Sequence, residues 1–277
     1  MQVLRPNQPV QLLSSPEERL DLAEALGIQV GVIQTFDRTF AQLSAREFVQ
    51  LLVDHLGLAR LVVGPDFALG RDRAGDIPTL VQLGQELGFD VSVLSPVDLE
   101  GDEVRSFVVR RTIAQGDVAR ARDFLGRCYC VVGEVVHGDG RGRTIGIPTA
   151  NLQVPPERLL PGDGVYATWT RLGTDPDAPR LASVTNIGVR PTVNGHRRQV
   201  ETHIFDFPPA GQSGDLYGQT LVLEFVRRLR GEKRFESLDA LVAQIHKDMD
   251  AARSVLAQDL ADGRRKTEDE GQRTEDV

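Results

Sequence analysis

A glycine-rich segment in the second half of the chain has the composition of a phosphate-binding loop. Four glycines fall within nine residues, and Arg143 lies among them; the glycines are Gly138, Gly140, Gly142 and Gly146. Glycine lets the backbone approach phosphate oxygens closely and turn its N–H groups toward an anion. We therefore predict that this segment binds the phosphates of a nucleotide. The alternative is a flexible hairpin tip, which also favours glycine.

Two oxygen-bearing side chains follow this segment. Thr149 and Asn151 are two residues apart in a stretch that resembles a β-strand, so their side chains point to the same side. A hydroxyl and an amide oxygen are hard ligands that Mg²⁺ accepts beside phosphates and water. We predict a cation site here. Hydrogen bonding at a strand end is the alternative role for both residues.

An acidic residue interrupts a later apolar stretch. Glu201 lies in the predicted strand 200–207 and shares a face with His203. A carboxylate in such a stretch is costly unless it is paired or has a chemical task. Glu201 is therefore a candidate general base toward a hydroxyl group, and a salt bridge on the sheet face is the alternative. A Glu-x-His metal pair would need a third ligand, which no nearby histidine spacing supplies.

The elements around these residues form a run of strands. Apolar stretches separated by turn residues occur at 130–136, 145–152, 164–169, 181–187, 200–207 and 219–225. Consecutive strands without intervening helices predict a six-stranded antiparallel barrel. A helix capped by Ser237 and running to about residue 256 closes the domain. The polar segment 259–277 is predicted to be a disordered tail.

The first half alternates helices and short apolar strands instead. Helices begin after Ser15 and Ser44 and over residues 78–87, and strands are predicted at 30–33, 61–64 and 91–94. This order is typical of a doubly wound parallel α/β sheet. The sequence thus predicts an α/β domain over residues 1–125 and a barrel domain over 126–258.

The composition of the chain disfavours several classes of function. The 277 residues are 40% hydrophobic and 26% charged, with a net charge of −8 and 5% aromatic residues. An acidic chain with few aromatic residues is unsuited to nucleic-acid binding. No apolar run reaches the length of a membrane span, and the first residues do not resemble a signal peptide. We expect a cytoplasmic protein without nucleic-acid or membrane partners.

The motifs of the second half resemble the riboflavin kinase module of the bacterial bifunctional riboflavin kinase/FAD synthetase family. The resemblance extends over residues 127–257. It rests on the glycine-rich segment with Pro-Thr-Ala-Asn-Leu at 148–152, Gly-Val-Tyr at 164–166, Asn-Ile-Gly-Val-Arg-Pro-Thr at 186–192, Glu-Thr-His-Ile-Phe-Asp-Phe at 201–207, Asp-Leu-Tyr-Gly at 215–218 and Ala-Gln-Ile-His-Lys-Asp at 243–248.

This resemblance implies phosphoryl transfer from ATP to the 5′-hydroxyl of riboflavin, giving FMN and ADP. The glycine-rich segment and Thr149 would bind ATP, Thr149 and Asn151 would hold Mg²⁺, and Glu201 would act as the base. Three further residues are implied to contact the flavin substrate: Asn186, Arg190 and Thr192.

The first half resembles the FAD synthetase (adenylyltransferase) module of the same family. The stretch 64–76 matches its Gly-x-Asp-Phe-x-Phe-Gly-x-x-Arg-x-Gly-Asp pattern with small departures. A second signature, Ser-Ser-Thr-x-Ile-Arg, is altered at 105–110, where Arg105 and Phe107 replace hydroxyl residues. The family's initial Gly-x-Phe-Asp-Gly-x-His-x-Gly-His loop is absent from this sequence.

We therefore expect FMN adenylylation to be absent or severely impaired. Two other interpretations stay open. The first is a bifunctional enzyme whose true N-terminus precedes Met1. The second is a non-catalytic protein that binds flavin or nucleotide as a regulator; it has no need for a general base such as Glu201.

Overall fold

The computed structural model describes residue 3 and residues 11–192, 195–208 and 215–275. The chain divides into two compact units, Met1–Val104 and Arg105–Val277. Each unit is considered by itself.

The first unit contains helices around a two-stranded parallel sheet. Helix α1 (Pro16–Ala25) and helix α2 (Ala45–Leu56) each begin with a serine whose hydroxyl accepts a backbone N–H, and each has a glutamate that closes the capping box. Strands β1 (Arg60–Val63) and β2 (Asp90–Val93) pair in parallel. Helix α3 (Ile77–Leu87) connects them, and the 3-10 turns η1 (Phe40–Gln42) and η2 (Arg71–Arg73) precede α2 and α3.

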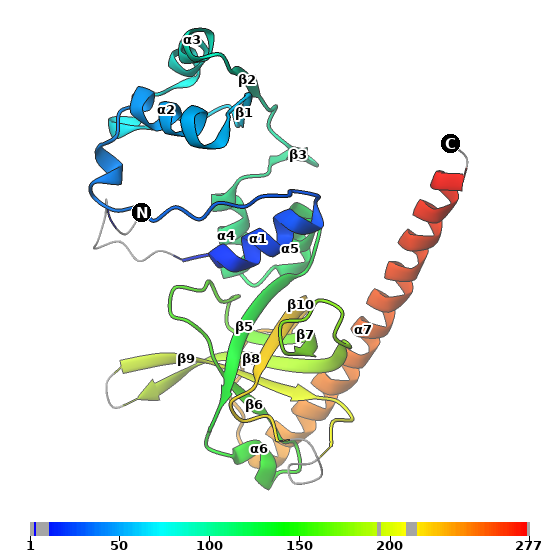
Figure 1. Cartoon of the computed structure of the whole chain (residues 1–277). Helices are drawn as coiled ribbons and strands as arrows, with labels where there is room; N and C mark the ends of the chain where they lie inside the picture. Colours follow the sequence, from blue (N-terminus) through cyan, green and yellow to red (C-terminus); the bar gives the residue numbers. More distant parts are fainter. Residues whose placement is uncertain (1–2, 4–10, 193–194, 209–214, 276–277) are drawn as a thin grey trace. The chain divides into compact units, whose positions relative to one another are not determined.

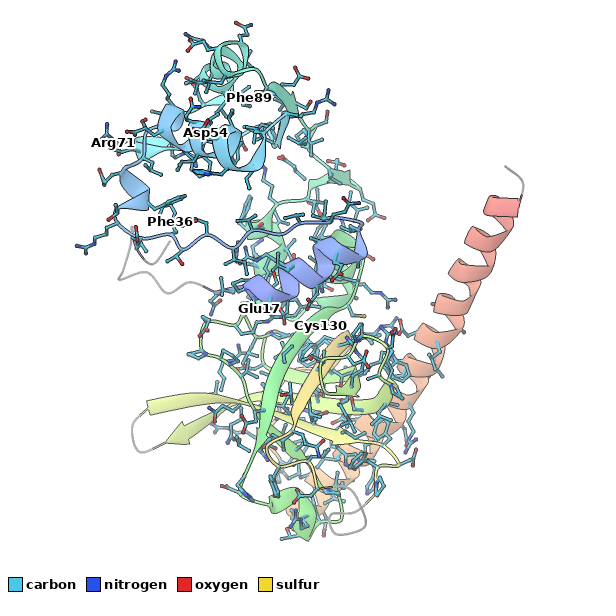
Figure 2. All side chains as sticks on the ribbon, viewed as in Figure 1. Glu17, Phe36, Asp54, Arg71, Phe89 and Cys130 are labelled. Carbon is cyan, nitrogen blue, oxygen red and sulfur yellow. The ribbon has the colours of Figure 1, made fainter. Side chains whose placement is uncertain are left out.

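The core of this unit lies between α2, α3 and β2. Val49, Leu80 and Phe89 are buried in it, and Figure 2 labels Phe89. The predicted strand 30–33 does not form: Val30 is 76% exposed and the segment has no regular structure. Its backbone pairs with no neighbour in the described sheet, and an extended segment without a hydrogen-bonded neighbour is not stable as a strand. Phe36, also labelled in Figure 2, is 44% exposed.

Four short elements connect the core of the first unit to the barrel in the sequence. Strands β3 (Asp98–Leu99) and β4 (Asp102–Glu103) form a small hairpin in the first unit. In the second unit, helices α4 (Ser106–Ala114) and α5 (Val118–Leu125) pack against each other, and α5 packs on β5 and β10.

The second unit is a closed six-stranded antiparallel barrel, as the sequence predicts (Figure 1). Its strands follow the order β10-β5-β6-β9-β8-β7 around the barrel. They are β5 (Tyr129–Val136), β6 (Ala150–Gln153), β7 (Gly164–Leu172), β8 (Leu181–Thr192), β9 (Gly195–Ile204) and β10 (Thr220–Arg230).

The predicted strand 145–152 is shorter than expected. The glycine-rich segment contains the short helix α6 (Arg141–Thr144), and β6 begins only at Ala150. Pro148 has no N–H to contribute to a ladder, so the strand starts beyond it.

Hydroxyl groups form a chain inside the barrel. Thr168 hydrogen-bonds Ser183 and Thr185 at 2.8 and 2.7 Å, and Thr185 donates to Thr202 at 2.9 Å. These side chains are almost completely buried. Each buried hydroxyl has partners, so the polar interior is satisfied without water. Side chains between these positions face the outside of the barrel.

Helix α7 (Leu238–Glu275) covers one part of that outer face. Its residues Ala252 and Leu256 pack on Ala167, Trp169 and Val184 of β7 and β8. The helix continues well past residue 256. It runs through residues 259–275, which are part of the segment for which the sequence predicts a disordered tail.

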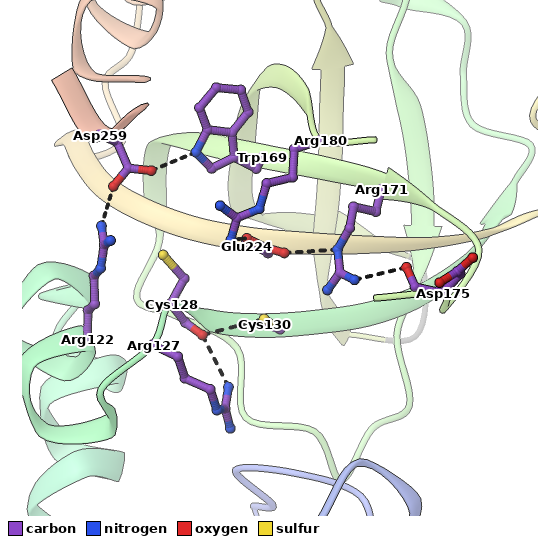
Figure 3. A network of polar contacts seen from close by, with 10 residues as sticks. All are labelled: Arg122, Arg127, Cys128, Cys130, Trp169, Arg171, Asp175, Arg180, Glu224 and Asp259. Carbon is purple, nitrogen blue, oxygen red and sulfur yellow. Dashed lines mark hydrogen bonds and ion pairs between the residues drawn. The ribbon is translucent and has the colours of Figure 1, made fainter. Parts of the chain in front are cut away.

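A polar network fastens α7 to the barrel unit (Figure 3). Asp259 accepts a hydrogen bond from the Trp169 indole N–H at 2.8 Å and forms an ion pair with Arg122 of α5. Nearby, the buried carboxylate of Glu224 pairs with Arg171 at 2.9 Å and with Arg180. Asp259 thus belongs to the packed structure.

Candidate active site

A cavity of about 250 Å³ opens on the outer face of β6, β8 and β9. It brings together several of the residues singled out from the sequence. Its lining consists of Asp139, Gly140, Gly142, Thr149, Asn151, Asn186, Gly188, Val189, Gln199, Glu201 and Glu232. Strand residues form its floor, and the glycine-rich segment supplies one wall.

Strand register places Glu201 at the centre of this floor. Glu201 pairs with Asn151 of β6 on one side and with Asn186 of β8 on the other. Its neighbours Val200 and Thr202 are buried in the barrel interior. Side chains alternate along a strand, so Glu201 points outward into the cavity, and directly paired residues point to the same side.

Asn151 has a buried oxygen that the protein itself does not satisfy. Its Oδ1 atom is inaccessible to solvent and makes no hydrogen bond with any described residue. Buried polar atoms are almost always partnered, so this oxygen fits a role in binding a ligand at the cavity. Thr149 is two residues earlier and lines the same cavity. The two oxygens have the chemistry that Mg²⁺ requires.

The glycines of the segment allow it to lie against this floor. A Cβ at Gly138 would be 2.2 Å from Nδ2 of Asn151, and one at Gly142 would be 2.2 Å from the carbonyl oxygen of Ile147. Any other residue would push these groups apart. Gly140 and Gly146 instead have positive φ angles of 70° and 76°. The segment is therefore shaped by its glycines rather than only made flexible by them.

Several predicted residues lie beside the cavity rather than in its lining. Gly138, Gly146 and the exposed Arg143 belong to the glycine-rich segment but do not line the cavity. The backbone of Arg190 and Thr192 is part of β8, and their side chains lie outside the described residues.

Sequence reasoning missed three polar residues of the lining. Gln199 is two residues before Glu201 on the same face of β9, so strand alternation alone was a sufficient signal. Asp139 and Glu232 come from loops, where no periodicity indicates the direction of a side chain. The Glu232 carboxylate lies over Gly188, where an added Cβ would be 2.6 Å from its Oε1 atom.

The two halves of the chain match different family models. Residues 125–256 match the model described as riboflavin kinase, and residues 1–108 match the model described as FAD synthetase. The bifunctional riboflavin kinase/FMN adenylyltransferase of Escherichia coli K12 is 40% identical over 247 residues, covering 88% of this chain and 75% of that protein. The chain belongs to this family. The Bacillus subtilis family member is 31% identical over 252 residues, covering 90% of this chain and 76% of its own length.

A solved structure is also similar to most of this chain. It is described as a macrolide-efflux protein from Streptococcus pneumoniae, with a TM-score of 0.80 and 30% identity, covering 91% of this chain and 79% of its own. In the described part of the present chain, none of the helices combines the length and apolar character needed to cross a membrane.

Proposed function

We propose that this chain is a riboflavin kinase, which transfers the γ-phosphoryl group of ATP to the 5′-hydroxyl of riboflavin and releases FMN and ADP. The observation that carries the proposal is the pairing of Glu201 with Asn151 in one cavity, beside the glycine-rich segment. A carboxylate that can accept a proton then lies next to an amide oxygen that can hold a cation. Family membership supports the same activity.

The glycine-rich segment is proposed to bind the ATP phosphates. Gly140 and Gly142 line the cavity, so their backbone is accessible to a ligand there. Close backbone approach is needed because phosphoryl transfer depends on positioning and on charge neutralisation more than on covalent chemistry by the protein. Arg143 and Gly146 complete this segment, and Thr149 ends it.

Thr149 and Asn151 are proposed to hold Mg²⁺. The buried, unpartnered Oδ1 of Asn151 fits this assignment, as does the placement of both residues on the cavity. Among the lining residues whose side chains the structure describes, the charged ones are the carboxylates Asp139, Glu201 and Glu232. When bound, the cation would offset the charge of the phosphates in this acidic surrounding.

Glu201 is proposed to remove the proton from the attacking hydroxyl as the new P–O bond forms. The bond from the γ-phosphorus to the ADP oxygen breaks in the same exchange, and Glu201 later returns the proton to solvent. General base catalysis of this kind contributes about 10²–10⁴-fold to the rate. Asn186, which pairs with Glu201, is proposed to contact the flavin substrate together with Arg190 and Thr192.

The FMN adenylyltransferase half is proposed to be inactive or severely impaired. Arg105, at the start of α4, makes no side-chain capping hydrogen bond, and Phe107 is 61% exposed. Neither side chain can replace the hydroxyl groups that the family signature places there. Purified protein with FMN, ATP and Mg²⁺ should form little FAD. Abundant FAD from the unaltered chain would contradict this proposal.

We also propose the domain division 1–125 and 126–258 and a cytoplasmic location, where ATP is available as co-substrate. Riboflavin, FMN, ATP and ADP are the proposed ligands, and neither nucleic acid nor a membrane is a proposed partner.

The decisive experiment follows riboflavin-dependent ATP consumption and identifies the flavin product. FMN should form in proportion to ADP and should require a divalent cation. A non-catalytic regulator would bind flavin or nucleotide without consuming ATP, so binding without turnover would overturn the kinase proposal.

A further inference from the structure

We propose that His203 is a positioning residue for the cation-binding end of the cavity. In this proposal, the imidazole holds the carbonyl group of Pro148 and thereby sets the place of Thr149, the next residue. The inference rests on the proposed role of Thr149 in Mg²⁺ binding and assigns a task to a histidine that the proposed reaction does not use.

The contact itself is short and joins two elements. Nδ1 of His203 on β9 lies 2.7 Å from the carbonyl oxygen of Pro148, which precedes β6. A carbonyl oxygen only accepts hydrogen bonds, so Nδ1 must carry the proton in this contact. His203 is two residues from Glu201, so both side chains project from the same face of β9. The imidazole therefore connects the face that carries the base to the chain that carries Thr149.

The backbone hydrogen bonds of β6 do not extend as far as Thr149, so a side-chain contact is needed to hold this part of the chain. The pairing of β6 with β9 ends at Ala150 and Thr202, and the pairing of β6 with β5 ends at Asn151. Thr149 thus lies just beyond both ladders. Pro148 cannot donate a hydrogen bond, so the ladder cannot continue through it. The His203 side chain tethers this chain to β9 where the backbone pairing has stopped.

The imidazole ring also contacts an aromatic side chain of the core. His203 packs edge-on against Phe205, with ring centroids 5.7 Å apart and an interplanar angle of 67°. Phe205 is 5% exposed and belongs to the core between the barrel and α7. This contact restricts the rotation of the imidazole ring, as a group that orients a metal ligand requires.

The hydrogen bond between His203 and Pro148 also affects the glycine-rich segment. The N–H of Ile147 donates to the carbonyl of Gly142 at 2.8 Å, and a Cβ on Gly142 would lie 3.3 Å from Oγ1 of Thr149. Residues 142–149 are therefore a compact loop, and a shift of Pro148 moves both the proposed phosphate-binding backbone and the Thr149 hydroxyl.

The test compares two variants of His203. His203→Phe keeps the ring and its packing on Phe205 but removes the donor. His203→Asn places an amide N–H close to the position of Nδ1 and should restore the contact. His246→Phe, on the exposed side of α7, is the matched control. Binding of Mn²⁺ in the presence of ADP is followed by electron paramagnetic resonance, and kcat and KM for riboflavin are measured separately.

We expect His203→Phe to weaken Mn²⁺ binding about tenfold, the usual effect of losing a group that orients a metal ligand. Its kcat should fall while its KM for riboflavin stays unchanged. His203→Asn should recover most of both losses, and His246→Phe should behave as the unaltered protein. Wild-type Mn²⁺ binding by a folded His203→Phe protein would overturn the proposal.

If His203→Phe does not fold, the protonated ring nitrogen of His203 can be determined in the unaltered protein. Long-range ¹H–¹⁵N correlation spectra report which ring nitrogen carries the proton. The neutral His203 ring should be the Nδ1–H tautomer, and the Nε2–H tautomer would overturn the proposal. If the protein binds Mn²⁺ with ADP but does not phosphorylate riboflavin, the kinase proposal fails while the comparison of His203 variants still decides this inference.

Discussion

Glu201 lies directly opposite Asn151 in the pairing of β6 with β9, and both side chains line one cavity. Facing residues on neighbouring strands have Cβ atoms about 4.5–5.5 Å apart. The ladder hydrogen bonds therefore hold a carboxylate and an unpartnered amide oxygen at a fixed separation. A base and a cation ligand arranged in this way need little reorganisation before a hydroxyl group attacks a phosphate.

Replacement of Gly138 by alanine should displace the proposed cation ligand Asn151 without changing that residue itself. The added Cβ would be 2.2 Å from Nδ2 of Asn151, so the amide must rotate away. We expect Gly138→Ala to raise the Mg²⁺ concentration needed for half-maximal FMN formation by about tenfold or more.

The control is Gly263→Ala on α7, where an added Cβ meets no atom within 4 Å. It should leave the Mg²⁺ dependence unaltered. An unchanged Mg²⁺ requirement in Gly138→Ala would show that the position of Asn151 is irrelevant to cation binding.

Asp259 should stabilise the barrel unit through its contacts with Trp169 and Arg122. Burial by itself raises the pKa of Asp259, but hydrogen bonds from these two residues outweigh it and hold the pKa below the usual carboxyl value. A carboxylate whose folded-state pKa is lowered contributes stability above its unfolded-state pKa and loses it as the pH falls through the folded-state pKa. Asp259→Asn should lower the free energy of unfolding at pH 7 by about 1–3 kcal/mol.

Trp169 is the only tryptophan in the chain, so tryptophan fluorescence reports directly on the contact between Trp169 and Asp259. Denaturant unfolding is measured between pH 7 and pH 3, with the exposed Asp250→Asn as control. The difference between wild type and Asp259→Asn should shrink at the acidic end. A difference that is constant with pH, or absent at pH 7, would contradict the role of Asp259.

The two cysteines should be unreactive in the folded protein. Burial raises the pKa of Cys128 and raises the pKa of Cys130 to about 12, so both remain thiols at pH 8. The thiolate is the reactive form. A chromogenic disulfide reagent should label neither cysteine in the native protein and both after unfolding in guanidinium. Rapid labelling of the native protein would contradict the raised pKa values of these thiols.

Much of the barrel could be predicted from the sequence because alternation and turn residues mark antiparallel strands clearly. The same signal overestimated the strand predicted at 145–152, because Pro148 interrupts the stretch and β6 begins only at Ala150. It also failed at residues 30–33, because a buried strand depends on neighbours that local composition does not reveal. The predicted helix ends near residue 256 because its apolar stripe ends there, whereas α7 extends to Glu275.

The site residues that lie on strands could be predicted from the sequence, whereas those on loops could not. Glu201 and Asn151 were predicted from their residue types and from the alternation of side chains along a strand. The structure pairs them. Asp139 and Glu232 enter the cavity from loops, and the tether from His203 to Pro148 joins residues far apart in the sequence. Such contacts depend on the closure of the barrel, which no local pattern encodes.

The most direct test of the account is the rate of FMN formation by Glu201→Gln. The amide preserves the size of the side chain but cannot accept the hydroxyl proton as a carboxylate does. The account predicts that kcat falls about 10²–10⁴-fold, with binding of riboflavin and of Mg²⁺ with ADP retained. Glu157→Gln, an exposed change outside the cavity, should keep full activity. Undiminished FMN formation by folded Glu201→Gln would contradict the central claim that this carboxylate activates the attacking hydroxyl.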